Sequence, residues 1–211
     1  MNRRHFLAAI AAIGGVAAAG HSVQAQQGRA ASGSAVPGAE TFVASLAQRG
    51  IADLTGRNTG ESERTRRFRT LLTENFDVPT IGRFALGRYW RVATEQERSE
   101  YMNLFGDMLV ATYANRFAEY QGEQVRVTGS RTTPEGDIIV ASDVARPNQP
   151  APNKVDWFLR RDGSSFKVVD VRVEGVSMAI TQRDEFAAII QRGGGQISAL
   201  LQTMRERSGR R

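Results

Sequence analysis

The sequence predicts an α+β fold: a bent four-stranded antiparallel sheet enclosed by N- and C-terminal helices, with an apolar cavity between them. Apolar residues recur at helical spacing up to about residue 120 and again after Gly175, but they alternate between Gln124 and Val173. Turn sequences join the alternating segments, so neighbouring strands are expected to be antiparallel. Helices can cover one face of such a sheet, and a curved sheet leaves a hollow beneath them.

The N-terminal residues have the features of an export signal. Arg3 and Arg4 precede an uncharged apolar run, and Ala25 offers a small residue at the position that a signal peptidase recognises. The arginine pair also matches the twin-arginine pattern, and a general secretory signal with two arginines fits equally well. The expected organisation is a twin-arginine-like signal peptide (1–25), a flexible lead-in (26–38), a single domain (39–204) and a basic tail (205–211).

Composition excludes several kinds of chemistry. The chain has no cysteine, and its two histidines, His5 and His21, lie within the expected signal peptide. The mature chain would therefore form no disulfide and no Ser-His or Cys-His nucleophile pair, and it would lack the usual ligands of zinc, copper and haem. We expect no metal and no cofactor. Scattered arginines without interleaved aromatic residues also predict no nucleic-acid binding.

Three helices are expected before the longest one. Residues 39–54 and 61–76 each carry an apolar stripe at helical spacing. Asp77 can cap the third helix, which we expect to run on through Leu86 to Trp90. Their apolar stripes are available to cover the sheet.

The longest helix is expected to open at Thr94. Thr94 and Glu97, three residues later, form a capping box. The apolar positions that follow extend to about Tyr120 and cover a broad band rather than one narrow stripe. We therefore expect this helix to be buried along two lines of contact.

Four strands and two helices complete the chain. The strands are expected over residues 125–127, 138–144, 155–159 and 166–173. Gly129 is expected to end the first strand, and Asp162-Gly163 is expected to form the hairpin turn before the fourth. After a turn at Gly175 the helical period returns in two segments, which Gly193 to Gly195 separate.

Large apolar residues on the inner face of this fold are candidates for a ligand pocket. The expected pocket-lining residues are Leu109, Tyr113, Phe117, Ile138, Val140, Trp157, Leu159, Val169, Val171, Val173, Met178 and Ile180. Such a set fits a binding site that is lined mostly by apolar side chains. The same residues would also suit a structural or adaptor protein whose interior is fully packed.

Carboxylates provide the alternative, an enzyme of a cone-shaped α+β fold that acts on a small apolar substrate. The candidates for acid–base work are Asp143, Asp156, Asp170 and Glu174. Asp170 is the strongest of them because it lies among valines. The competing interpretation makes Asp170 a turn carboxylate that accepts hydrogen bonds from backbone amides.

Several short motifs are spread along the chain. The C-terminal motif comprises Asp170, the run Glu174-Gly-Val-Ser-Met178, and Arg183-x-Glu-Phe186. Upstream lie Leu86-Gly-Arg-Tyr-Trp-Arg91, the Thr94-x-x-x-Arg98 helix start, Phe105, Thr112-Tyr-Ala114 and Tyr120. In their order and spacing, over nearly the whole mature chain, these motifs resemble the MlaC-like, toluene-tolerance family of periplasmic phospholipid-binding proteins.

The resemblance implies a non-enzymatic phospholipid carrier of the periplasm, with phospholipid as its cargo. It also implies two partners: an inner-membrane ABC transporter with a lipid-binding MCE component, and an outer-membrane lipoprotein complex. The implied fold, a bent antiparallel sheet with helices around an acyl-chain pocket, agrees with the fold predicted from periodicity.

Overall fold

The computed structural model describes residues 34–56, 59–147 and 149–208. The expected signal peptide, most of the lead-in and the last three residues lie outside these ranges. Within them, no helix combines the length and the apolar character that crossing a bilayer requires.

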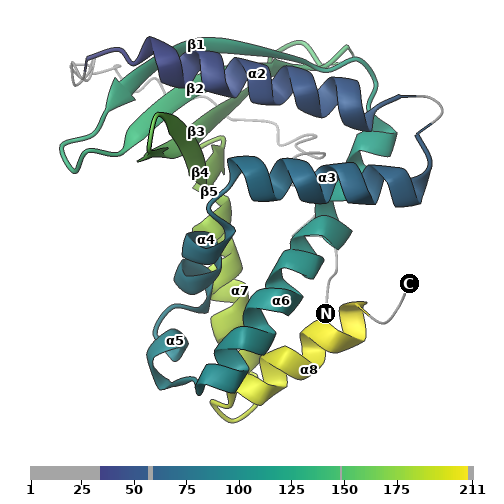
Figure 1. Cartoon of the computed structure of the whole chain (residues 1–211), viewed down its shortest axis with the longest axis vertical. Helices are drawn as coiled ribbons and strands as arrows, with labels where there is room; N and C mark the ends of the chain where they lie inside the picture. The colour runs from purple at the N-terminus through teal and green to yellow at the C-terminus, as the bar shows by residue number, and fades with distance from the viewer. Residues whose placement is uncertain (1–33, 57–58, 148, 209–211) are drawn as a thin grey trace, which may run out of the picture.

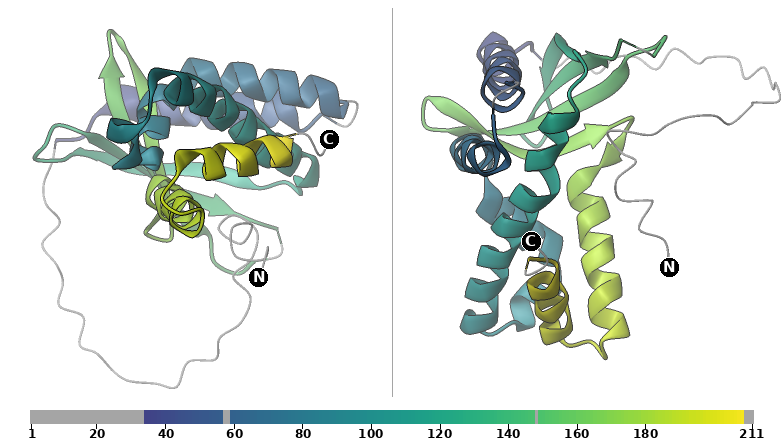
Figure 2. Two further views of the ribbon diagram at one scale, coloured as in Figure 1. Left: turned by 90° about the horizontal axis from the view of Figure 1, so that it is seen from below. Right: turned by 90° about the vertical axis from the view of Figure 1, so that its right-hand side faces the viewer.

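The structure consists of an antiparallel sheet, two helices that cover it and a helical layer that extends from one end of it (Figures 1 and 2). The helices are α2 (Pro37–Leu54), α3 (Glu61–Asn75), α4 (Val78–Leu86), α5 (Tyr89–Val92), α6 (Glu95–Tyr113), the 3₁₀ helix η1 (Ala114–Glu119), α7 (Met178–Arg192) and α8 (Ile197–Ser208). The strands are β1 (Gln124–Thr132), β2 (Ile138–Ala145), β3 (Asn153–Asp162), β4 (Ser165–Val173) and β5 (Val176–Ser177).

The sheet confirms the α+β prediction, with one strand more than expected. Its strands follow chain order, and each pairs antiparallel with the next. The fifth strand, β5, has only two residues, and it pairs with the end of β4 after the turn at Glu174 and Gly175. Both turn residues have positive φ, 50° and 80°, which favours glycine at the second. A strand of two residues is too short to show an alternating pattern in the sequence.

Two of the predicted helix starts are confirmed by side-chain caps. The Asp77 carboxylate accepts a hydrogen bond from the Thr80 backbone N–H at 3.0 Å. At the start of α6, the Glu97 N–H donates to Thr94 Oγ1 at 3.2 Å, and the Thr94 N–H donates to Glu97 Oε2 at 2.9 Å. Local sequence therefore sets where α4 and α6 begin.

Removing the α6 cap should have a measurable cost. We expect Thr94→Ala to lower the free energy of unfolding by about 1–2 kcal/mol, because it leaves helix N–H groups without an acceptor. Urea unfolding followed by circular dichroism measures this loss. Thr73→Ala is the control, since the exposed Thr73 hydroxyl only bonds carbonyls within its own helix. Equal losses in the two variants would contradict the capping role.

Several boundaries differ from the prediction, and three of these differences have a clear structural cause. The helix expected to reach Trp90 is broken at Gly87, whose φ of 59° ends α4 before the short α5 begins. A Cβ at this position would also lie 3.3 Å from Cδ of Arg183. The longest helix is α-helical only to Tyr113 and then continues as η1. Gly129 does not end the first strand but lies at a shift of register, after which β1 pairs with β2 to its end.

The helical layer and the sheet each have an apolar core, and a third buried cluster lies around Phe68. In the helical layer, Tyr101, Phe105 and Phe186 are almost fully buried, with ring centroids 5.7 to 6.2 Å apart. The Tyr101 hydroxyl donates to the Gly82 carbonyl at 2.9 Å, and burial raises the pKa of this tyrosine far above its usual value. The second core lies between the sheet and α2. Its buried members are Ala39, Val43, Leu46, Ile138, Val140, Leu159, Phe166 and Val168.

A backbone contact joins the helical layer to the sheet at β4. Phe76 and Val168 form a parallel β-bridge, and the Asp77 N–H donates to the Val168 carbonyl at 2.9 Å. The corner between α3 and α4 is therefore hydrogen-bonded directly to the middle of this strand.

Candidate functional site

The expected pocket residues on β2 and β3 lie in the core beneath α2. Ile138, Val140 and Leu159 are at most 2% exposed, and they pack with the apolar side of α2. Because α2 already covers these three side chains, they can contact a ligand only if α2 moves.

Trp157 and Val171 lie beside this core and are only half-buried. They face each other across β3 and β4 in the antiparallel register. The Trp157 indole N–H donates to Ser142 Oγ at 3.0 Å, and the Ser142 hydroxyl donates to the Val155 carbonyl at 3.2 Å. These hydrogen bonds orient the indole, so its ring offers a fixed apolar surface next to Val171.

Leu109, Tyr113 and Phe117 supply a second half-buried surface, from α6 and η1. They pack against a cluster that α3 and α6 form around Phe68, and the Phe117 and Phe68 ring centroids are 5.8 Å apart. Burial raises the pKa of the Tyr113 hydroxyl, which therefore stays protonated and uncharged at neutral pH.

The sheet surface and the α6 surface are neighbours. Leu71 of α3 and Phe76 contact both the core beneath α2 and the cluster around Phe68. The structure thus brings together eight of the twelve expected lining residues in two adjoining apolar clusters. These eight are Leu109, Tyr113, Phe117, Ile138, Val140, Trp157, Leu159 and Val171.

The other four expected lining residues lie outside these two clusters within the described ranges. Val173 is buried at the end of β4, while Val169 and Met178 are half-buried. Ile180, in the first turn of α7, is 40% exposed.

A shift in strand register explains why Val169 differs from Val171. Phe158 pairs with Asp170 but Leu159 pairs with Val168, so Val169 has no partner on β3. As a result Phe166, Val168 and Val171 all contact the core beneath α2, although strict alternation would put Val171 on the opposite face from the other two. Phe166 and Val168 are the inner-face residues that sequence periodicity missed.

Asp170 is held by three hydrogen bonds at the turn into α7. Its Oδ1 accepts from the backbone N–H groups of Val171 at 2.9 Å and Ala179 at 3.0 Å, and its Oδ2 accepts from the Ser177 hydroxyl at 2.7 Å. Ser177 in turn caps α7 by accepting from the Ile180 N–H at 3.0 Å. A carboxylate engaged in this way orders the chain, as the turn interpretation predicts.

Two of the other candidate carboxylates, Asp143 and Glu174, are also bound by neighbours. Asp143 Oδ1 accepts from Lys154 Nζ at 2.7 Å, and Oδ2 accepts from Arg126 at 2.8 Å. The Lys154 hydrogen bond, reinforced by Arg126, holds the pKa of Asp143 below its usual range. Glu174 accepts from the Lys154 backbone N–H. Across the described ranges, no three His, Cys, Asp or Glu side chains come close enough to hold a metal ion.

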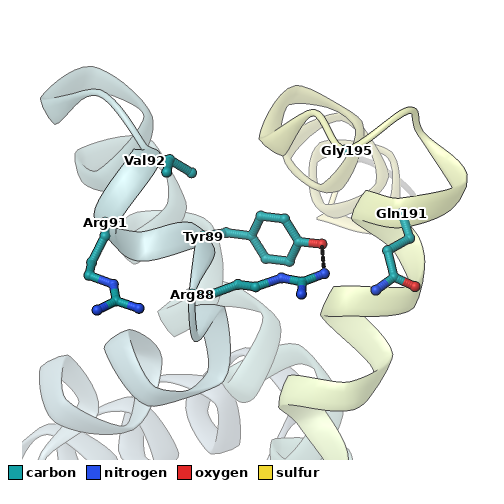
Figure 3. Close-up of a pocket in the computed structure, with 6 residues that line it drawn as sticks. All are labelled: Arg88, Tyr89, Arg91, Val92, Gln191 and Gly195. Carbon is teal, nitrogen blue, oxygen red and sulfur yellow. Dashed lines mark hydrogen bonds between the residues drawn. The ribbon is translucent and has the colours of Figure 1, made fainter.

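A separate depression of about 600 Å³ opens to solvent between α5 and the turn from α7 to α8 (Figure 3). It is lined by Arg88, Tyr89, Arg91, Val92, Gln191 and Gly195. Arg88 Nη2 donates to the Tyr89 hydroxyl at 3.0 Å, and its guanidinium lies over the Tyr89 ring. Sequence periodicity did not predict this site. The available signal was a segment with three arginines and no acidic residue between Asp77 and Glu95.

Comparisons with known proteins agree on one family. The family model described as MlaC protein matches residues 44–206. The toluene tolerance protein Ttg2D of Pseudomonas putida is 27% identical over 110 residues, which are 52% of this chain and 51% of that protein. This chain therefore spans about half the length of the curated relative that it matches.

A solved structure shares the fold. It is that of a phospholipid-binding protein from Ralstonia solanacearum in complex with a phospholipid, and it superposes with a TM-score of 0.71. The match covers 81% of this chain and 97% of that protein at 22% identity. The family match over most of its length shows that the chain belongs to the MlaC family.

Proposed function

We propose that this protein is a phospholipid carrier that moves lipid between the inner and outer membranes, and that it holds acyl chains between the sheet and α6. The observation that carries the proposal is the pair of adjoining half-buried surfaces, Trp157 and Val171 on the sheet and Leu109, Tyr113 and Phe117 on α6 and η1. The lipid named for the Ralstonia solanacearum protein supports phospholipid as the cargo.

The physical requirement of such a carrier is an apolar surface shielded from water. Exposing one CH₂ group to water costs about 0.8 kcal/mol, so an acyl chain of about sixteen carbons costs on the order of 12 kcal/mol. Apolar side chains that are neither fully packed nor fully exposed can accept such a chain without breaking the core. No charged side chain is needed for this step, and no catalytic group either.

The proposal extends to all twelve residues expected to line the pocket, with different roles. Trp157, Val171, Leu109, Tyr113 and Phe117 would contact the acyl chains directly. The seven others would form the floor and the rim of the lipid site: Ile138, Val140, Leu159, Val169, Val173, Met178 and Ile180.

Location and partners belong to the same proposal. The carrier would work in the periplasm after removal of residues 1–25. It would exchange phospholipid with an inner-membrane ABC transporter that has an MCE component, and with an outer-membrane lipoprotein complex. The export features at the N-terminus and membership of the MlaC family support this assignment.

Mass spectrometry of the intact protein under native conditions tests the cargo directly. We expect protein isolated from the periplasm of an expressing bacterium to carry an added mass equal to one phospholipid, and solvent extraction should release the same lipid. Folded protein that carries no lipid by either method would refute the carrier function.

A further inference from the structure

The outer corner formed by α4 and α5 has an unusual surface. Phe84 is 41% exposed and Val92 is 73% exposed, which makes them two of the few large apolar side chains that face solvent. Both lie in the segment between Asp77 and Glu95, which contains arginines at 83, 88 and 91 and no acidic residue. Figure 1 shows α5 at the outer corner of the helical layer. We call the surface made by Arg83, Phe84, Arg88, Trp90, Arg91, Val92, Arg98 and Arg183 the α4–α5 patch.

Guanidinium groups in the patch lie over its aromatic rings. Arg83 and Arg98 are 5.9 and 5.5 Å from the Trp90 ring centroid, and Arg183 of α7 is 4.9 Å from that of Phe84. Arg98 Nε also donates to the Trp90 carbonyl at 2.9 Å, which ties α5 to α6. Cation–π contacts therefore join Trp90 with Arg83 and Arg98, and Phe84 with Arg183.

The positive charge of the patch is largely uncompensated. Within the described ranges, Arg83, Arg88, Arg91 and Arg98 form no ion pair, whereas Arg183 lies 3.7 Å from Asp184. Nearby acids are occupied: Glu97 completes the α6 cap, and Glu100 pairs with Arg205. Glu95 is the exception, an exposed carboxylate at the start of α6.

The exposed arginines of α3 behave differently. Arg66 and Arg67 both bond Glu63, and Arg69 bonds Asp107 at 2.7 Å. The exposed arginines of α3 are thus neutralised by carboxylates of the same protein. The α4–α5 patch differs in this respect, and it also exposes apolar side chains.

We propose that the α4–α5 patch docks the protein on the surface of an anionic phospholipid bilayer. Arginine, tryptophan and exposed apolar side chains together suit the membrane interface, where charges meet lipid phosphates and apolar groups enter the acyl boundary. The open depression beside Arg88 and Tyr89 offers room for a phosphate head group at the same surface. Arginine binds phosphate through several N–H donors in a planar array.

Vesicle sedimentation tests the docking, with protein purified from the periplasm and its N-terminus determined by mass spectrometry. We expect binding to vesicles that contain phosphatidylglycerol and none to vesicles of phosphatidylcholine alone. The double variant Arg83→Gln/Arg88→Gln should bind about 30-fold more weakly, since each cation near an anionic surface contributes about fivefold. Arg66→Gln/Arg131→Gln removes the same charge from other exposed positions and should bind as the wild type does.

Substitutions at Val92 separate bilayer docking from binding to an acidic protein. Val92→Ser removes apolar surface without adding charge and should weaken vesicle binding, whereas Val92→Trp should strengthen it and give a blue-shifted tryptophan emission on anionic vesicles. Three results would overturn the proposal. The first is a wild type that does not bind anionic vesicles, and the second is binding that Arg66→Gln/Arg131→Gln weakens as much as Arg83→Gln/Arg88→Gln does. The third is vesicle binding that does not change with the residue at position 92, together with equally strong binding to soluble polyglutamate.

The use of this surface for lipid delivery rests on the proposed carrier function, but vesicle binding does not. Native mass spectrometry of Arg83→Gln/Arg88→Gln should show unchanged lipid content. If the wild type docks on vesicles but carries no lipid, the carrier function is refuted and bilayer docking through the α4–α5 patch stands. If it carries lipid but does not dock, bilayer docking is refuted and the carrier function stands.

Discussion

Val171→Glu should empty the carrier of phospholipid, with lipid content reduced at least tenfold. Val171 is half-buried and faces Trp157 across β3 and β4, where we place an acyl chain. A carboxylate at this position would have to lose its hydration against the acyl chain, which costs several kcal/mol. Because Val171 is not fully buried, the charge can reach water once the lipid has left. Native mass spectrometry measures the remaining lipid.

Val176→Glu is the matched control for this prediction. It makes the same change in the neighbouring strand β5, where the valine is 55% exposed. We expect Val176→Glu to retain its lipid and both variants to keep the wild-type circular dichroism spectrum. Val171→Trp adds bulk without charge and should also displace lipid. A folded Val171→Glu protein with full lipid content would place the acyl chains elsewhere.

Asp170→Ala should produce the largest loss of stability among substitutions of polar residues at the turn between β4 and α7. It removes the acceptor of three hydrogen bonds, from Val171, Ser177 and Ala179, and Ser177 is only 6% exposed. Buried donors left without a partner cost about 1–3 kcal/mol each, and part of that is recovered by relaxation. We expect a decrease in the free energy of unfolding of about 3 kcal/mol, measured by urea denaturation at neutral pH.

Asp184→Ala controls for the change in charge, because Asp184 is an exposed carboxylate of α7. We expect it to lower stability by less than about 0.5 kcal/mol. Asp170→Asn should lie between the two, since the amide oxygen can still accept one or two of the hydrogen bonds. Equal stabilities of Asp170→Ala and Asp184→Ala would show that the turn is held by other contacts.

Features determined by a few neighbouring residues were predictable from the sequence. Thr94 with Glu97, Asp77, and the Asp162-Gly163 turn all lie where the sequence predicts them, because capping and tight turns depend on local hydrogen bonds. Asp170 belongs to the same group, since its three partners lie within nine residues of it. Periodicity also predicted the order of helices and strands.

Features determined by pairing between distant residues were not predictable in this way. The register shift at Phe158 and Leu159 depends on how β3 meets β4, and it moves Val169 out of phase with Val171. The close approach of the Arg183 side chain, from α7, to Gly87 likewise joins residues far apart in the sequence. For the same reason the sequence could not separate side chains buried under α2, such as Leu159, from those left half-exposed beside it.

Strand β4 holds the chain at both points where it passes from the sheet side into the helical layer. The Val168 carbonyl accepts a hydrogen bond from the Asp77 N–H before α4, and the Asp170 side chain accepts one from the Ala179 N–H at the start of α7. Helices α4 and α7 are therefore bound to the same strand. The start of α2 is likewise bound to β1, since Ser130 Oγ accepts a hydrogen bond from the Val36 N–H and donates one to the Glu40 carboxylate. In hydrogen–deuterium exchange, the amides of Asp77 and Ala179 should therefore be slow to exchange with or without lipid, while the response to cargo should concentrate in α6 and η1, where we place the acyl chains.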